Sequence, residues 1–180
     1  MKVKDSKGSG MLRRNALGAG YTLIELMVTV AVVAVLATVA IPNFSTFISN
    51  SRERADVQSM LKALVAARSE AVVRARPVIL TANGGDWAKG WQTWVDLNNN
   101  GSFDAGEAFK ETPPIKTSAK ITAKIGTSSV NSVTFDNQGF IQDSKAVVLS
   151  YRSEPEKCSH DRDINITASG QVTITDRVCP

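Results

Sequence analysis

The sequence predicts an α+β protein in which one long N-terminal α-helix packs on an antiparallel β-sheet head. Two observations lead to this prediction. Residues 21–76 hold a nearly unbroken helical pattern, and after Pro77 the pattern changes to short strand-like runs separated by turn residues. The chain of 180 residues has about the length of one domain. We therefore expect a single head attached to a long helix.

Basic side chains concentrate at the N-terminus. The chain has 21 basic and 17 acidic residues, and residues 1–20 carry five of the basic ones against Asp5 alone. The remainder has 16 of each, so the formal charge of +4 belongs to the first 20 residues. A neutral remainder argues against a nucleic-acid surface, because phosphate binding requires clustered Lys and Arg.

Residues 21–41 form a largely apolar run in which Glu25 is the only charged side chain, and a run of this length is long enough to cross a bilayer. The basic residues on its N-terminal side predict that the N-terminus lies in the cytoplasm. We therefore expect a single pass through the inner membrane, with everything after Ile41 in the periplasm.

A small residue, Gly20, directly precedes the apolar run. An ordinary secretory signal has its small-residue cleavage site after the apolar stretch, so that the stretch is lost. Cleavage between Gly20 and Tyr21 would instead remove a leader of residues 1–20 and keep the apolar helix. The order of these features predicts a mature chain that begins at Tyr21.

Glu25 is the chemically unusual residue of this helix. A carboxylate in hydrocarbon is costly unless it is paired, and an ionisable residue inside a membrane span is by default functional. The best partner is the α-amino group created at Tyr21, in the same chain or in a neighbouring copy. Pairing with a neighbour would neutralise both groups and fix axial register, so Glu25 is predicted to act in assembly. The alternative is that Glu25 extends to the lipid headgroups.

Residues 42–76 have the pattern of an amphipathic helix that belongs to the head. Pro42 removes one helical hydrogen bond and is expected to kink or locally melt the helix. Pro77 disfavours continuation, so the helix is predicted to run until Arg76. Apolar residues recur at spacings of three and four, which predicts one apolar face: Phe44, Phe47, Ile48, Val57, Met60, Leu61, Leu64, Ala67, Ala71 and Val72.

Residues 77–180 are predicted to form a β-rich periplasmic head. Turn sequences separate its apolar runs, as at Asn137-Gln138-Gly139 and Ser169-Gly170. The runs predicted as strands are residues 78–80, 91–95, 120–125, 133–135, 147–149, 164–166 and 172–174.

The N-terminal motif resembles the signature of the type IV prepilin and type II secretion pseudopilin superfamily. In that superfamily a Gly, an aromatic residue and a Glu at the fifth mature position precede an apolar helix, which matches Gly20, Tyr21 and Glu25. The resemblance implies that a prepilin peptidase/methyltransferase cleaves after Gly20 and N-methylates Tyr21. It further implies a filament subunit whose partners are other pilin or pseudopilin subunits.

The head resembles the GspH/FimT group of minor pilins and pseudopilins. The resemblance rests on residues 64–74, on Gly90-Trp91, on the turn at 96–107 and on residues 135–139. It implies a structural subunit, not an enzyme, that primes or caps either a type IV pilus or a type II secretion pseudopilus. The extended leader and the C-terminal cysteine pair favour the pilus.

Residues 96–107 satisfy the pattern of a calcium-binding loop. A hard cation takes six or seven oxygen ligands, and the glycine at the sixth place fits the sharp turn. Asn, Asp and Gly are equally what a tight hairpin loop requires, and strands are predicted on both sides. Calcium, the one cofactor considered, and a plain hairpin loop therefore remain as alternatives. The candidate calcium ligands are Asp96, Asn98, Asn100, Ser102, Asp104 and Glu107.

Two cysteines, Cys158 and Cys179, lie in the part of the chain predicted to be periplasmic. An oxidising compartment favours a disulfide between them. Zinc would need more ligands than these cysteines and the lone His160 supply. His160 lies in a charged, turn-like stretch and is predicted to be a surface residue, so we find no nucleophile with a positioned base.

DNA binding in natural transformation is the alternative function, because some members of the GspH/FimT group bind DNA. In those relatives the resemblance implies a Gly-Arg-x-Arg motif near the C-terminus. The corresponding segment, Gly170-Gln171-Val172-Thr173, lacks both arginines. Acidic residues offset the four basic residues that could gather near the disulfide, which are Arg152, Lys157, Arg162 and Arg177.

Overall fold

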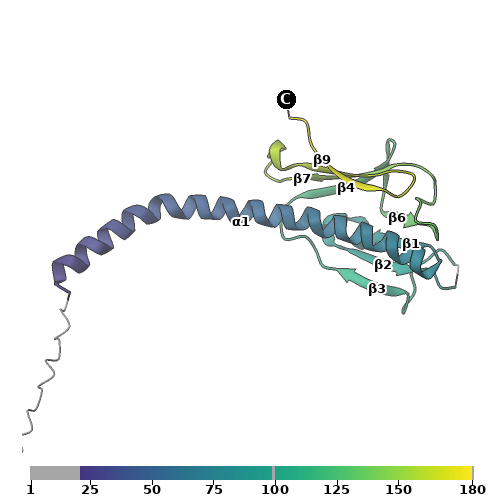
Figure 1. The fold of residues 1–180 in the computed structure, drawn as a ribbon, viewed down its shortest axis with the longest axis horizontal. Coiled ribbons are helices and arrows are strands. Elements are labelled where there is room, and N and C mark those ends of the chain that lie inside the picture. Colours follow the sequence, from purple (N-terminus) through teal and green to yellow (C-terminus); the bar gives the residue numbers. More distant parts are fainter. Residues whose placement is uncertain (1–20, 99, 180) are drawn as a thin grey trace, which may run out of the picture. The chain divides into compact units, whose positions relative to one another are not determined.

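The computed structural model describes residues 21–98 and 100–179, and its longest element is helix α1, Leu23–Arg74 (Figure 1). The chain divides into two compact units, Met1–Asn43 and Phe44–Pro180. α1 supplies the described helix of the first unit and the long helix of the second. All of the strands among the described residues belong to the second unit.

A kink or local melting was expected at Pro42, and the melting does not occur. α1 is helical without interruption from Leu23 to Arg74. A proline removes a single N–H donor from the hydrogen-bond ladder, and the bonds on either side of it are enough to keep the helix intact.

α1 ends two residues earlier than predicted, because its last turn closes on itself. Ala75 adopts the left-handed conformation, with a φ of 50°. The backbone N–H of Arg76 donates to the carbonyl of Ala71 at 3.2 Å, and that of Ala75 donates to Val72 at 3.3 Å. This pair of bonds is the Schellman arrangement, which satisfies the last carbonyls of a helix.

The strands form two antiparallel sheets, and every predicted strand is confirmed. The first sheet has the order β3-β2-β1-β6, with β1 Val78–Ala82, β2 Trp91–Val95, β3 Ala108–Thr112 and β6 Ser132–Phe135. The second has the order β5-β4-β7-β8-β9, with β4 Lys120–Ile125, β5 Ser128–Val130, β7 Val147–Arg152, β8 Arg162–Ile166 and β9 Val172–Asp176. Short 3-10 turns lie at η1 Asn83–Gly85, η2 Trp87–Lys89 and η3 Cys158–His160.

Strands β3 and β5 were not predicted. Each lies at the edge of its sheet, and neither has a fully buried side chain. Each strand has a single apolar side chain packed against the core, Phe109 in β3 and Val130 in β5, and therefore lacks the alternating apolar pattern by which strands are recognised in a sequence.

One apolar core joins α1 to both sheets, and Figure 1 shows the helix running alongside them. The residues that α1 buries in it are Val57, Met60, Ala63, Leu64, Ala67 and Ala71, and the sheets add, among others, Leu80, Phe135, Leu149 and Ile164. The buried face is narrower than predicted, because Val72 is 51% exposed and Leu61 is only partly buried. Phe44 and Phe47 also lie outside the core, at 64% and 66% exposure.

Arg68 ties α1 to two turns of the head. Its Nε donates to the carbonyl of Gly139 and its Nη2 to the carbonyl of Ser169, each at 3.1 Å. Gly170 follows with a φ of 74°, and a Cβ there would lie 1.9 Å from the Gly139 carbonyl oxygen. The contact between the two turns therefore requires glycine at position 170.

Candidate functional site

The start of α1 is a capped helix end that carries the predicted assembly residue. Thr22 precedes the helix, and its Oγ1 accepts the backbone N–H of Glu25 at 3.2 Å. Glu25 lies in the first turn, where a carboxylate interacts favourably with the positive end of the helix dipole. Thr22 and Glu25 have the spacing of a capping box, a signal that the sequence analysis missed. Glu25 thus has a position suited to starting the helix, besides its predicted part in assembly.

Within the first unit, α1 carries apolar side chains on all of its faces, and they are exposed. The hydroxyls of this segment bond to its own backbone: Thr29 Oγ1 donates to the Leu26 carbonyl at 2.8 Å, and Thr38 Oγ1 donates to Val35 at 2.7 Å. A helix that is apolar all round is stable only in apolar surroundings. The large apolar residues that are exposed here are Leu23, Ile24, Leu26, Met27, Val28, Val30, Val32, Val33, Val35, Leu36 and Ile41.

Within the part of the chain that the structure describes, no helix reaches the length and apolarity needed to cross a membrane. The membrane span predicted for residues 21–41 is not confirmed and stays a prediction. Gly20 and the predicted leader of residues 1–20 lie outside the described residues. Tyr21 is described and is highly exposed, directly before the capping residue.

Residues 96–107 connect β2 to β3, and their polar groups bond within the loop. The Asp96 carboxylate accepts two backbone N–H groups, at 3.1 and 2.8 Å. Asp104 Oδ2 accepts the side-chain amides of Asn98 at 2.8 Å and Asn100 at 2.6 Å. The backbone N–H of Ser102 donates to the Asn100 side chain at 2.7 Å.

Glu107 fastens this loop to the end of β2. It is only 6% exposed, and its carboxylate oxygens accept the backbone N–H groups of Leu97 at 2.8 Å and Asp104 at 2.9 Å. Both carboxylate oxygens of Glu107, a candidate calcium ligand, are therefore hydrogen-bonded to the chain. Among the described residues, no group of three or more acidic, His or Cys side chains is placed to hold a metal. The hairpin connection is confirmed, and calcium binding stays a proposal.

A calcium titration decides between the two interpretations of this loop. A ligand that binds only the folded state stabilises it by about 2.7 kcal/mol at 100 times its Kd. If the loop binds calcium, differential scanning fluorimetry of chelator-treated protein should show a Tm that rises with calcium and not with magnesium. A Tm that does not respond to calcium would leave only the self-bonded hairpin loop.

The predicted disulfide between Cys158 and Cys179 is present, with an S–S distance of 2.07 Å and a Cα–Cα distance of 5.8 Å. It joins η3 to the segment that follows β9, and so closes a loop that contains β8 and β9.

The three arginines near the disulfide are matched by acidic groups. This pairing offsets the charge of three of the four basic residues that had been considered for DNA binding. Arg152 contacts Asp163 at 2.7 Å, Arg162 contacts Asp176 at 2.9 Å, and Arg177 contacts Asp161 at 2.7 Å and Glu156 at 2.9 Å.

Asp161 is the buried centre of this network, with none of its side chain exposed. Its Oδ1 accepts the backbone N–H of Ser153 at 2.8 Å, and its Oδ2 accepts Arg177 Nη1 at 2.7 Å. Burial alone would raise the pKa of Asp161. The hydrogen bonds from Ser153 and Arg177 outweigh it, so that the pKa lies below its ordinary value.

Asp161 should make the free energy of unfolding depend on pH. A carboxyl with a lowered folded-state pKa stabilises the fold above its unfolded pKa, about 3.9 for Asp, and this stabilisation is lost as the pH falls further. Asp161→Asn should therefore be most destabilising at about pH 7 and should approach wild type below about pH 4. Urea unfolding across this range measures the difference in unfolding free energy between wild type and Asp161→Asn. Asp143→Asn, at an exposed position, is the control. A difference that is independent of pH would contradict a stabilising role for the ionised Asp161 carboxylate.

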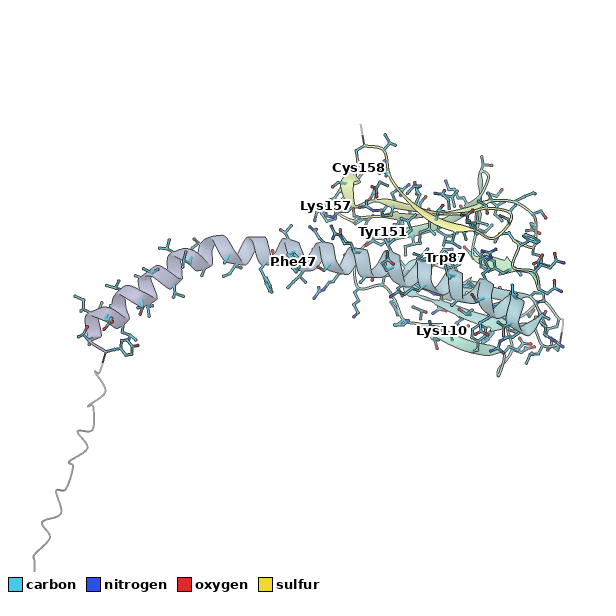
Figure 2. The ribbon with its side chains drawn as sticks, in the orientation of Figure 1. Phe47, Trp87, Lys110, Tyr151, Lys157 and Cys158 are labelled. Carbon is cyan, nitrogen blue, oxygen red and sulfur yellow. A yellow bond between two sulfur atoms is a disulfide. The ribbon has the colours of Figure 1, made fainter. Side chains whose placement is uncertain are left out.

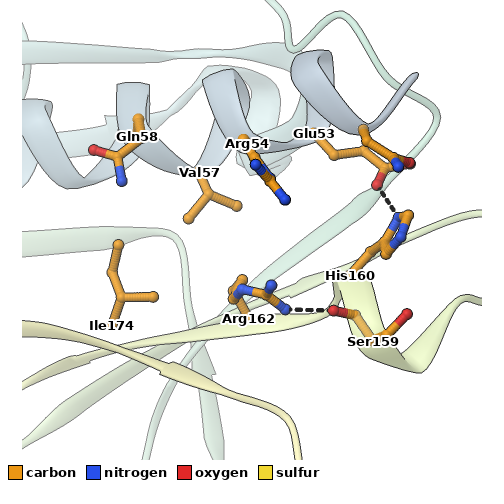
Figure 3. A pocket seen from close by; sticks show the side chains of 9 residues that line it. Glu53, Arg54, Val57, Gln58, Ser159, His160, Arg162 and Ile174 are labelled. Atoms are coloured by element: carbon orange, nitrogen blue, oxygen red, sulfur yellow. Dashed lines mark hydrogen bonds and ion pairs between the residues drawn. The ribbon is translucent and has the colours of Figure 1, made fainter. Parts of the chain in front are cut away.

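His160 is not the surface residue that was predicted. Its Nδ1 pairs with Oε2 of Glu53, a buried residue of α1 (Figure 3). The pair lies at one end of a cleft of about 430 Å³ that Val57 and Ile174 also line. A signal was present in the sequence: Glu53 precedes Val57 by four residues and therefore falls on the buried helix face.

Comparisons with known proteins agree with these features. Residues 56–170 match the family described as Type II transport protein GspH, and residues 18–41 match the prokaryotic N-terminal methylation motif. The type IV major pilin protein PilA of Myxococcus xanthus is 45% identical over 56 residues, which are 31% of this chain and 25% of PilA. The chain thus spans a quarter of the length of that relative.

Two solved structures share the fold. The type IV minor pilin FimU of Pseudomonas aeruginosa superimposes with a TM-score of 0.60 at 20% identity, over 72% of this chain and 92% of FimU. The minor pseudopilin EpsH from the type 2 secretion system of Vibrio cholerae gives 0.53 at 10% identity, over 69% and 97%.

The methylation motif, the long N-terminal helix and the antiparallel sheets place the chain in the class of type IV pilins and pseudopilins. Within that class, the chain belongs to the GspH family.

Proposed function

We propose that this protein is a minor pilin or pseudopilin that enters a type IV pilus or a type II secretion pseudopilus and primes or caps the filament. One observation carries the proposal: the first unit exposes an apolar helix whose first turn holds Glu25. Such a surface needs apolar neighbours, and similar helices of other subunits would supply them. The role is structural, and no catalytic role is proposed.

In this proposal the chain first spans the inner membrane once, with its N-terminus in the cytoplasm and its head in the periplasm. The prepilin peptidase/methyltransferase removes residues 1–20 after Gly20 and methylates Tyr21. Glu25 then pairs with the terminal amine of a neighbouring subunit. FimU belongs to a pilus and EpsH to a secretion system. The extended leader and the C-terminal cysteine pair favour the pilus.

Replacing Glu25 by alanine should exclude the protein from filaments. Loss of one partner from a buried ion pair costs about 3–5 kcal/mol, which corresponds to roughly a hundredfold or more in incorporation. Quantitative mass spectrometry of sheared filaments, relative to membrane-bound protein, measures the effect. Glu70→Ala is the matched control, since it removes an exposed helical acid that pairs with Arg74. Normal incorporation of Glu25→Ala would refute the pairing mechanism.

A further inference from the structure

Exposed aromatic and cationic side chains lie together on α1 at the start of the second unit. Phe47 projects from the helix (Figure 2), and Arg52 is exposed as well. Both line a shallow hollow of about 610 Å³, together with Ile48 and the exposed Lys116. We call Phe47, Ile48, Arg52 and Lys116 the interface patch.

A buried polar network holds the Lys116 segment at this patch. The backbone N–H of Lys116 and the hydroxyl of Thr117 donate to the two carboxylate oxygens of Asp56, at 3.3 and 2.7 Å. Thr117 has one hydroxyl proton, so the Tyr151 hydroxyl, 2.8 Å away, donates to Thr117. Tyrosine is protonated at neutral pH, and burial, reinforced by nearby carboxylates, raises the pKa of Tyr151 further, to about 12. These hydrogen bonds hold the backbone of Lys116 in place, in the same hollow as Arg52.

The chemistry of the patch fits a lipid surface. Two cations and an aromatic ring share the hollow, and none of the described residues that line it is acidic. Aromatic rings with Lys and Arg beside them are typical of segments at the level of lipid headgroups. The patch also begins six residues after Ile41, where the predicted membrane span ends.

We infer that the interface patch binds the headgroups of anionic phospholipids in the periplasmic leaflet before the subunit enters a filament. This inference rests on the membrane anchoring in the proposed function. Each Lys or Arg near an anionic surface contributes about fivefold to binding, so that Arg52 and Lys116 together contribute about 25-fold. The head would then be held in one orientation while it waits for its neighbours.

Lysine acetylation in nanodiscs tests the inference. The full processed chain is placed at one copy per disc, in phosphatidylcholine alone or with phosphatidylglycerol added. An amine-reactive reagent then labels exposed lysines, and mass spectrometry compares Lys116 with Lys62, an exposed lysine of α1. We expect Lys116 to be labelled at least about fivefold more slowly in the anionic discs, with Lys62 unchanged.

Two variants sharpen the test. Arg52→Gln should remove most of the protection of Lys116, whereas Arg54→Gln, an exposed arginine outside the patch, should not. Equal labelling of Lys116 in both lipids would overturn the inference. Protection that appears only with two copies per disc would also overturn it, because another subunit would then be the occupant. Failure of the chain to enter discs would instead refute the proposed anchoring.

Discussion

Gly170→Ala should lower the free energy of unfolding by about 4 kcal/mol. A left-handed backbone costs a residue with a Cβ about 1–2 kcal/mol. The new Cβ would also lie 1.9 Å from the Gly139 carbonyl oxygen, a backbone atom that cannot rotate away. The two turns must therefore separate, which weakens the hydrogen bonds that Arg68 donates to them, each worth about 1.5–3 kcal/mol. Urea unfolding of the purified protein measures the loss.

Gly101→Ala is the matched control for this variant. Gly101 has the same φ of 74°, but a Cβ there would meet no atom within 4 Å. Gly101→Ala should therefore lower the free energy of unfolding only by the backbone cost, about 1–2 kcal/mol. Equal destabilisation by the two variants would show that the contact between the turns contributes nothing.

Removal of the disulfide should cost about 3 kcal/mol of unfolding free energy. The bond links residues 21 positions apart, and closing a loop of this length restricts the unfolded chain by about that amount. The variant is Cys158→Ser with Cys179→Ser, so that no free thiol remains. Urea unfolding under oxidising conditions gives the difference from wild type.

Reduction of the wild-type protein is the control for the disulfide. The chain has two cysteines, so a reductant should lower wild-type stability to that of the double variant and leave the variant unchanged. Stability that is the same with and without the bond would contradict the loop-entropy argument.

Much of the fold was predictable because it follows from local patterns. The core positions Val57, Met60, Leu64, Ala67 and Ala71 recur at helical spacing, and this spacing identified them correctly. The predicted strands carry β-branched or aromatic residues between turn sequences. The earlier end of α1 was less predictable, since alanine in place of glycine gives a weak signal for a Schellman end at Ala75.

The polar contacts were harder to predict, because they join residues distant in sequence. His160 and Glu53 are 107 positions apart, and Arg68 and Ser169 are 101 apart. The periodicity of apolar residues along the sequence does not indicate which distant residues pair. In the sequence Asp161 is one of several acidic residues near the C-terminus, and only the fold shows that it is fully buried and bonded to Arg177.

If the chain is processed as proposed, the threonine cap at the start of α1 would affect how it assembles. Thr22 is the second residue after the predicted cut, so the new terminus at Tyr21 would be attached almost directly to a rigid helix. Ordering each residue of a flexible end costs about 1–2 kcal/mol. A neighbouring subunit that binds this terminus would therefore lose little binding free energy to ordering it.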